Sequence, residues 1–124
     1  MTNSLDNEGD YQRINANNKQ RELVRAYLAS INYADQCVGI ILDALNKSKY
    51  KDNTIVILWG DHGWHLGEKL SYRKSKLWEE AMRVPFIISV PGVTKPESHT
   101  NRIVNLIDIY PTLSELCNLP KNKL

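Results

Sequence analysis

Two short apolar runs, separated by a long polar loop, constrain the fold of this chain most. Residues 54–58 (Thr-Ile-Val-Ile-Leu) and 86–90 (Phe-Ile-Ile-Ser-Val) are rich in β-branched and aliphatic side chains, a composition typical of strands buried on both faces. Between them, residues 59–85 carry histidine, tryptophan, lysine and arginine. A long loop in a compact domain is usually functional or disordered, and its tryptophans and histidines argue against disorder.

The rest of the pattern predicts helices around these strands. Residues 19–46 have apolar side chains at steps of three and four, which predicts one long helix. A helical turn is expected within residues 76–81, a short strand at 103–106 and a helix at 109–116, with Asp108 as its candidate N-cap. Helices that alternate with buried strands predict an α/β fold with a largely parallel sheet flanked by helices.

Domain organisation and composition are simple. Residues 1–18 are polar and are predicted to form a flexible N-terminal segment, which leaves one α/β domain in residues 19–124. The 16 basic and 14 acidic residues leave a net charge of +2, too weak a field to indicate a nucleic acid or a membrane as partner. Cys37 and Cys117 lie in helix-like apolar patterns and are expected to be buried free thiols. No signal peptide is recognised, and the cellular location is left open.

An Asp-His pair follows the first apolar run. Asp61 and His62 are flanked by Gly60 and Gly63, so that the backbone can turn sharply and approach a ligand. Open α/β sheets bind their ligands outside the carboxyl ends of the strands, and carboxylate and imidazole are both metal-ligating groups. The alternative interpretation is ordinary turn chemistry, since Asp and Gly are common after strands.

Several segments together resemble the sulfatase family, and in particular its iduronate-2-sulfatase-like branch within the alkaline-phosphatase-like superfamily. They occur in the family's order, and are G-D-H-G-W-H-L-G-E-K at 60–69, R-K at 73–74, L-W-E at 77–79, R-V-P-F-I-I at 83–88, P-G at 91–92 and V-N-L-I-D-I-Y-P-T-L at 104–113. The resemblance covers roughly residues 21–120. It implies an α/β sandwich with a largely parallel sheet, and the hydrolysis of sulfuric esters at a divalent-metal site, with Ca²⁺ as the expected ion.

The resemblance also implies parts that this sequence does not contain. The family's nucleophile is a formylglycine made from the cysteine of a Cys-x-Pro/Ala-x-Arg motif, and neither Cys37 nor Cys117 begins such a motif. No Asp-Asp pair follows a strand to supply the family's early metal ligands. The chain is therefore interpreted as the C-terminal part of a sulfatase catalytic domain without its nucleophile-bearing half, and the isolated chain is expected to be inactive.

The resemblance assigns roles to four residues. Asp61 and His62 match metal-site positions, and His62 is alternatively a sulfate contact or a loop histidine bonded to the backbone. Lys74 matches a loop lysine that contacts the sulfate and helps to protonate the leaving oxygen, its alternative being a solvated surface lysine. His65 is expected either to line the substrate pocket or to pack structurally.

Three classes of function remain open at this stage. The first is a sulfatase acting on a sulfate ester, with a sulfated sugar as the expected substrate. The second is a metal-dependent phosphoesterase or phosphomutase of the same superfamily. The third is a non-catalytic fragment or interaction piece, for which self-association or pairing with the absent N-terminal half is expected.

Overall fold

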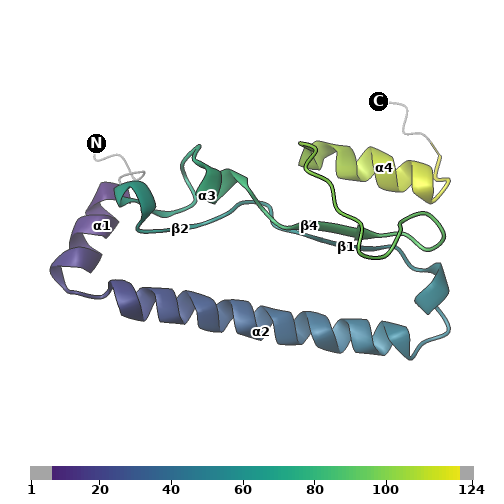
Figure 1. Ribbon diagram of the computed structural model, residues 1–124, viewed down its shortest axis with the longest axis horizontal. Helices are drawn as coiled ribbons and strands as arrows, with labels where there is room; N and C mark the ends of the chain where they lie inside the picture. The colour runs from purple at the N-terminus through teal and green to yellow at the C-terminus, as the bar shows by residue number, and fades with distance from the viewer. Residues whose placement is uncertain (1–6, 121–124) are drawn as a thin grey trace. The chain divides into compact units, whose positions relative to one another are not determined.

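The computed structural model describes residues 7–120, which divide into two compact units at Thr94 and Lys95. The first unit contains most of the regular structure (Figure 1). In chain order its elements are helices α1 (Asn7–Ala16) and α2 (Gln20–Asn46), strands β1 (Val56–Trp59), β2 (His65–Leu66) and β3 (Tyr72–Arg73), helix α3 (Glu79–Met82) and strand β4 (Phe86–Ser89). The second unit contains α4 (Ile109–Leu116).

Helix α2 confirms the long helix that the apolar periodicity predicted, beginning one residue later and ending at the same residue. Lys19 and Glu22 form an ion pair across its first turn, with a distance of 2.7 Å between the ammonium and carboxylate groups. Helix α1 was not predicted: the polar composition indicated a flexible segment up to residue 18, and residues 1–6 of that segment lie outside the described part of the chain. No helix within residues 7–120 is long and apolar enough to span a membrane.

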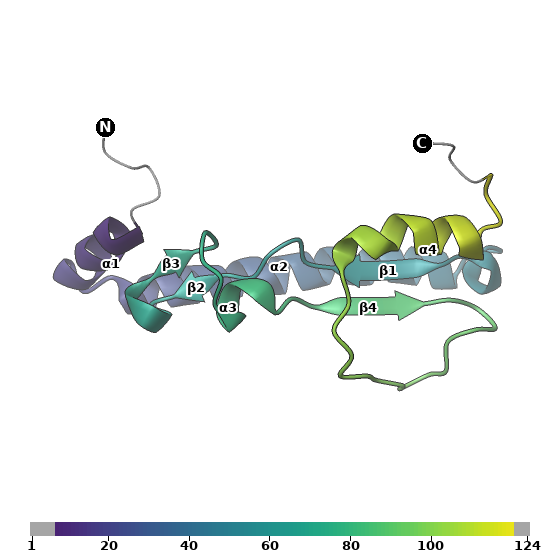
Figure 2. The same cartoon turned by 90° about the horizontal axis from the view of Figure 1, so that it is seen from above.

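Strands β1 and β4 form an antiparallel pair in which Val56 faces Ser89 and Trp59 faces Phe86. Figure 2 shows the two arrows side by side and pointing in opposite directions. The prediction of a largely parallel sheet is therefore not confirmed, since both sheets of the described residues are antiparallel pairs. Parallel strands need a crossover that returns the chain to its starting edge, whereas the segment between these strands folds into a second small hairpin and the single turn of α3.

Strands β2 and β3 form that second hairpin, in which His65 faces Arg73. Its connection is tight, because Gly67, Lys69 and Leu70 all adopt positive φ angles, of 119°, 52° and 55°. At Gly67 a side chain would also meet the Gln20 amide at 2.9 Å. Since positive φ is costly for residues with a β-carbon, the hairpin is held by its surroundings rather than by local preference.

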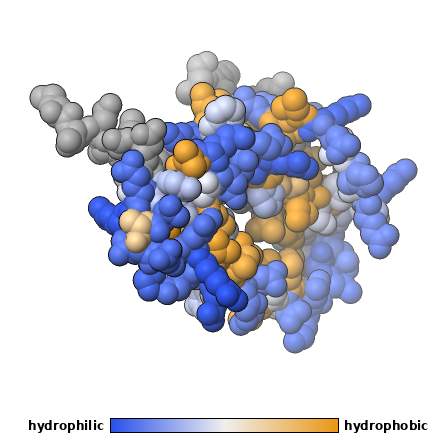
Figure 3. All heavy atoms as spheres, turned by 60° about the vertical axis from the view of Figure 1, so that its left-hand side comes forward, coloured by the Kyte–Doolittle hydropathy of each residue, from blue (hydrophilic) through white to orange (hydrophobic). Residues whose placement is uncertain are grey.

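The apolar core of the described residues is small. Among the described residues, the buried apolar side chains are Tyr72, Ala81 and Val90, and Figure 3 shows orange hydrophobic side chains at the surface among blue hydrophilic ones. The two free cysteines are not buried as predicted, since Cys37 is half-buried and Cys117 is exposed. The prediction that both apolar runs are buried on two faces is wrong here: Leu58 and Ile87 remain 41% and 59% exposed. A two-stranded sheet has too few neighbouring elements to cover two faces.

The second unit departs from one prediction and confirms another. Helix α4 coincides with the predicted helix at residues 109–116. The predicted strand at residues 103–106 is wrong, since residues 101–105 form neither helix nor strand and lead into a 3₁₀ turn at Leu106–Asp108. The Asn105 side chain accepts a hydrogen bond from the Ile107 amide at 3.3 Å and so turns the backbone. Asp108 occupies the N-cap position of α4 but makes no capping bond with its side chain.

Candidate functional site

Asp61 and His62 lie in the turn that follows β1, as the sequence predicted. The His62 Nδ1 atom lies 2.8 Å from the Gly63 carbonyl oxygen, so that this nitrogen donates and, in the neutral ring, Nε2 keeps a lone pair. That lone-pair nitrogen lies 3.6 Å from Asp61 Oδ1, on a carboxylate that is 82% exposed. An oxygen and a nitrogen at this separation and open to solvent can act as neighbouring ligands of one cation.

This pair by itself is only part of a metal site. No group of three or more His, Cys, Asp or Glu side chains suited to a metal ion occurs within residues 7–120. Calcium usually takes 6–8 oxygen ligands. The two side chains are therefore of a type that binds a divalent cation, but two ligands are too few for a stable site. The remaining ligands must come from elsewhere.

The turn is held in place by the backbone of α3. The Gly63 amide donates to the Ala81 carbonyl at 2.8 Å, and the Trp64 amide donates to the Glu80 carbonyl at 2.9 Å. A β-carbon at Gly63 would collide with the Glu80 carbonyl oxygen and would lie 3.1 Å from Ala81 Cα. Gly63 is thus required by a close approach, as the sequence indicated, but the partner in the structure is α3 rather than a ligand.

We expect Gly63→Ala to destabilise the chain by roughly 1–3 kcal/mol, because the added methyl group meets fixed backbone on α3. Chemical unfolding followed by circular dichroism measures the effect. Gly39→Ala is the matched control: nothing lies within 4 Å of a β-carbon at Gly39, and in the interior of α2 alanine is favoured over glycine by about 1 kcal/mol. Equal stability of Gly63→Ala and the parent chain would contradict the close packing described here.

Lys74 lies in the exposed loop after β3. Its neighbour Arg73 pairs instead with Asp10 of α1, with 3.1 Å between the guanidinium Nη2 and the carboxylate Oδ1. No hydrogen bond or ion pair joins Lys74 to Asp61 or His62 in the described part of the chain. The structure therefore leaves the Lys74 ammonium group exposed to solvent and separates it from the neighbouring arginine, whose charge has a partner.

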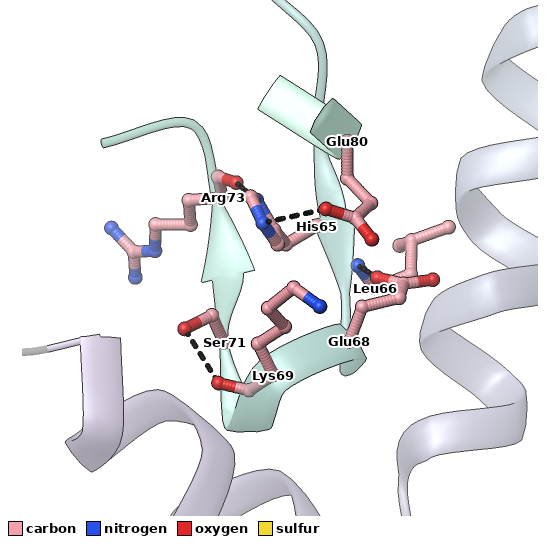
Figure 4. A network of polar contacts seen from close by, with 7 residues as sticks. All are labelled: His65, Leu66, Glu68, Lys69, Ser71, Arg73 and Glu80. Carbon is pink, nitrogen blue, oxygen red and sulfur yellow. Dashed lines mark hydrogen bonds and ion pairs between the residues drawn. The ribbon is translucent and has the colours of Figure 1, made fainter. Parts of the chain in front are cut away.

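His65 is completely buried, and this geometry supports the structural interpretation of the residue rather than the pocket-lining one. Its Nδ1 atom lies 3.2 Å from the Arg73 carbonyl oxygen, and its Nε2 atom lies 3.6 Å from Glu80 Oε2 (Figure 4). Sequence reasoning missed Glu80 because no local spacing connects it to His65. The residue before Glu80, Glu79, forms an exposed i,i+4 contact of 3.5 Å with Arg83 instead.

A cavity of about 360 Å³ lies between α1, α2 and the hairpin. Trp64 stacks on Tyr27 of α2, with ring centroids 6.2 Å apart and planes inclined by 19°, which agrees with packing as the role of this tryptophan. The buried Tyr72 forms another part of the wall, and burial, with smaller contributions from Tyr11 and Glu68, raises the pKa of its phenol. The sequence alone indicated no cavity, because its lining comes from separate elements.

Comparison with known proteins identifies the class of protein to which these features belong. The sulfatase family profile matches residues 4–119, and the chain belongs to the sulfatase family. It is 41% identical over 99 residues to a sulfatase of Formosa agariphila, 34% identical over 125 residues to mouse iduronate 2-sulfatase, and 36% identical over 111 residues to a choline-sulfatase of Rhizobium meliloti.

The matched regions cover 80%, 82% and 89% of this chain, but only 19%, 23% and 21% of those three relatives. The chain thus spans about a fifth of the length of the curated relatives that it matches. No solved structure matches it significantly. The resemblance identified from the motifs is confirmed at the level of the family, which suggests an α/β fold for the complete domain.

Proposed function

We propose that the complete protein carrying this sequence hydrolyses sulfate esters, and that Asp61 and His62 contribute to a Ca²⁺-type site at its catalytic centre. The observation that carries the proposal is the 3.6 Å distance between His62 Nε2 and Asp61 Oδ1 in the turn after β1. This pair lies inside the region that matches the sulfatases. We further propose that the rest of the catalytic domain supplies the remaining metal ligands, the formylglycine nucleophile and the parallel strands of the sandwich.

The chemistry assigns each residue a distinct task. A bound divalent cation would neutralise charge on the sulfate oxygens in the transition state. Asp61 and His62 would hold that cation, with the Gly63 and Trp64 amides fixing their turn against α3. Lys74 would place its ammonium group against the sulfate and provide a proton for the leaving oxygen. Among the relatives, one is named for iduronate and one for choline; for this chain we propose a sulfated sugar as the substrate class.

A phosphoesterase of the same superfamily is the second candidate, because an Asp-His pair after a strand can hold a cation next to either ester. Turnover of an aryl sulfate and an aryl phosphate by the complete protein, assayed at equal concentration with excess Ca²⁺, separates the two. The proposal requires that the sulfate be the faster substrate and that Asp61→Ala abolish its turnover, while Asp52→Ala, at an exposed aspartate in the turn before β1, leaves it unchanged. Preference for the phosphate would overturn the assignment.

Metal binding by the 124-residue chain alone is expected to be weak. Asp61 and His62 provide two ligands where Ca²⁺ usually takes 6–8, so that we expect a dissociation constant on the order of a millimolar or above, as in the weakest protein calcium sites. Isothermal titration calorimetry with Ca²⁺ measures it. Tight stoichiometric binding that survives in Asp61→Ala would show that other residues of this chain form a site.

A further inference from the structure

The contact between His65 and Glu80 contains two buried polar atoms that lack partners. Neither His65 Nε2 nor Glu80 Oε2 has a hydrogen-bond partner among the described residues, and both atoms are inaccessible to solvent. The rest of the Glu80 side chain is partly exposed, at 31%, whereas His65 is 0% exposed. Buried polar atoms without partners are costly, so an arrangement that leaves two of them facing each other needs an explanation.

The other nitrogen of the ring determines what the contact can be. The Arg73 carbonyl oxygen can only accept, so His65 Nδ1 must carry a hydrogen and donate to it across 3.2 Å. In a neutral ring, Nε2 is then an acceptor, and it faces a carboxylate oxygen that is also an acceptor when Glu80 is ionised. Two acceptors 3.6 Å apart become a favourable pair only when one proton lies between them.

Among residues 7–120, no other charged side chain forms a hydrogen bond or an ion pair with the His65 ring or the Glu80 carboxylate. In Figure 4 the Arg73 guanidinium extends away from the ring, and it is bound by Asp10. Glu68 accepts a hydrogen bond from the Leu66 amide at 2.6 Å, and Lys69 lies 5.0 Å from the centre of the Trp78 ring. On helix α2, the Gln20 amide lies beside Gly67 of the hairpin connection, and the Tyr27 ring stacks on Trp64.

The same contact connects the two parts of the candidate site. His65 holds the carbonyl of Arg73, the residue immediately before Lys74. Glu80 belongs to α3, whose carbonyls hold the amides of Gly63 and Trp64 directly after Asp61 and His62. We propose that His65 and Glu80 share one buried proton, and that this pair is a positioning device that holds the Lys74 loop in register with the Asp61–His62 turn. This role rests on the proposed sulfatase function, whereas the shared proton does not.

The first test measures the proton itself, in the complete protein. Two-bond ¹H–¹⁵N correlation spectra of the imidazole rings should show His65 with a proton on Nδ1 and a second, slowly exchanging proton on Nε2. That signal should disappear in Glu80→Gln and remain in Glu79→Gln, the same substitution at an adjacent exposed residue. A His65 spectrum that is identical in Glu80→Gln and the parent protein would overturn the shared proton.

The second test separates positioning from simple packing. In Glu80→Gln the side-chain amide can donate to neutral His65 Nε2 and so keep the contact without a shared proton. Glu80→Leu removes the contact. We therefore expect kcat for the aryl sulfate to fall about 10- to 100-fold in Glu80→Leu, the cost of a misplaced catalytic group. In Glu80→Gln kcat should remain near the parent value, because the amide preserves the contact.

The outcomes also distinguish this inference from the proposed function. If Asp61→Ala abolishes turnover of the aryl sulfate while Glu80→Leu keeps the parent kcat, the sulfatase proposal stands and the positioning role fails. If the complete protein turns over no aryl sulfate, the proposed function fails, and the ring spectra still decide whether His65 and Glu80 share a proton.

Discussion

The 124-residue chain by itself should show no turnover of an aryl sulfate above the background rate. The sequence contains no Cys-x-Pro/Ala-x-Arg motif, so it cannot form the formylglycine that the family resemblance implies as nucleophile. Removal of a nucleophile, as opposed to weakening of its neighbours, lowers kcat by roughly six orders of magnitude in well-studied hydrolases. The expected loss therefore exceeds the 10- to 100-fold effect expected of Glu80→Leu.

The measurement is a steady-state assay of the purified chain with excess Ca²⁺. A trace of a contaminating sulfatase would imitate activity, so Asp61→Ala, purified in the same way, is the matched control. Turnover that persists through repeated purification and is lost only in Asp61→Ala would show that this chain holds a complete catalytic apparatus, and would contradict the inference drawn from the absent motif.

The isolated chain should also self-associate in a concentration-dependent manner. Its described residues bury only three apolar side chains, whereas Ile40 and Ile41 of α2 are 70% and 67% exposed, and Ile87 of β4 is 59% exposed. Exposed apolar side chains in such number favour association, and the two-stranded β1–β4 sheet has unpaired edges. Multi-angle light scattering across a concentration series should show a mass that rises above that of the 14.2 kDa monomer.

A pair of matched variants tests whether apolar surface causes that association. The double substitution Ile40→Lys and Ile41→Lys adds two charges to the exposed apolar surface of α2 and should shift the mass toward the monomer. The control, Asn32→Lys with Gln36→Lys, adds the same charge to exposed polar positions of the same helix and should leave association largely unchanged. A strictly monomeric parent chain that unfolds cooperatively at high concentration would instead show that these residues form a complete domain.

The candidate metal ligands and the family were both accessible from the sequence. Asp61 and His62 could be placed after a strand because the apolar run and the glycines that flank the pair are local features, and the motifs from residue 60 to residue 113 identified the sulfatases. The helices at Gln20–Asn46 and Ile109–Leu116 were likewise predictable, since their apolar periodicity is contained within each segment.

Strand partners and buried contacts depended on the tertiary structure. An apolar run predicts a strand but carries no information on its neighbour, so the antiparallel pairing of Val56–Trp59 with Phe86–Ser89 could not be predicted. The same holds for His65 and Glu80, whose side chains meet only because the β2–β3 hairpin and α3 fold against each other. Periodicity and motif chemistry are properties of neighbouring residues, whereas register, burial and the sharing of a proton arise between segments that the chain brings together only when it folds.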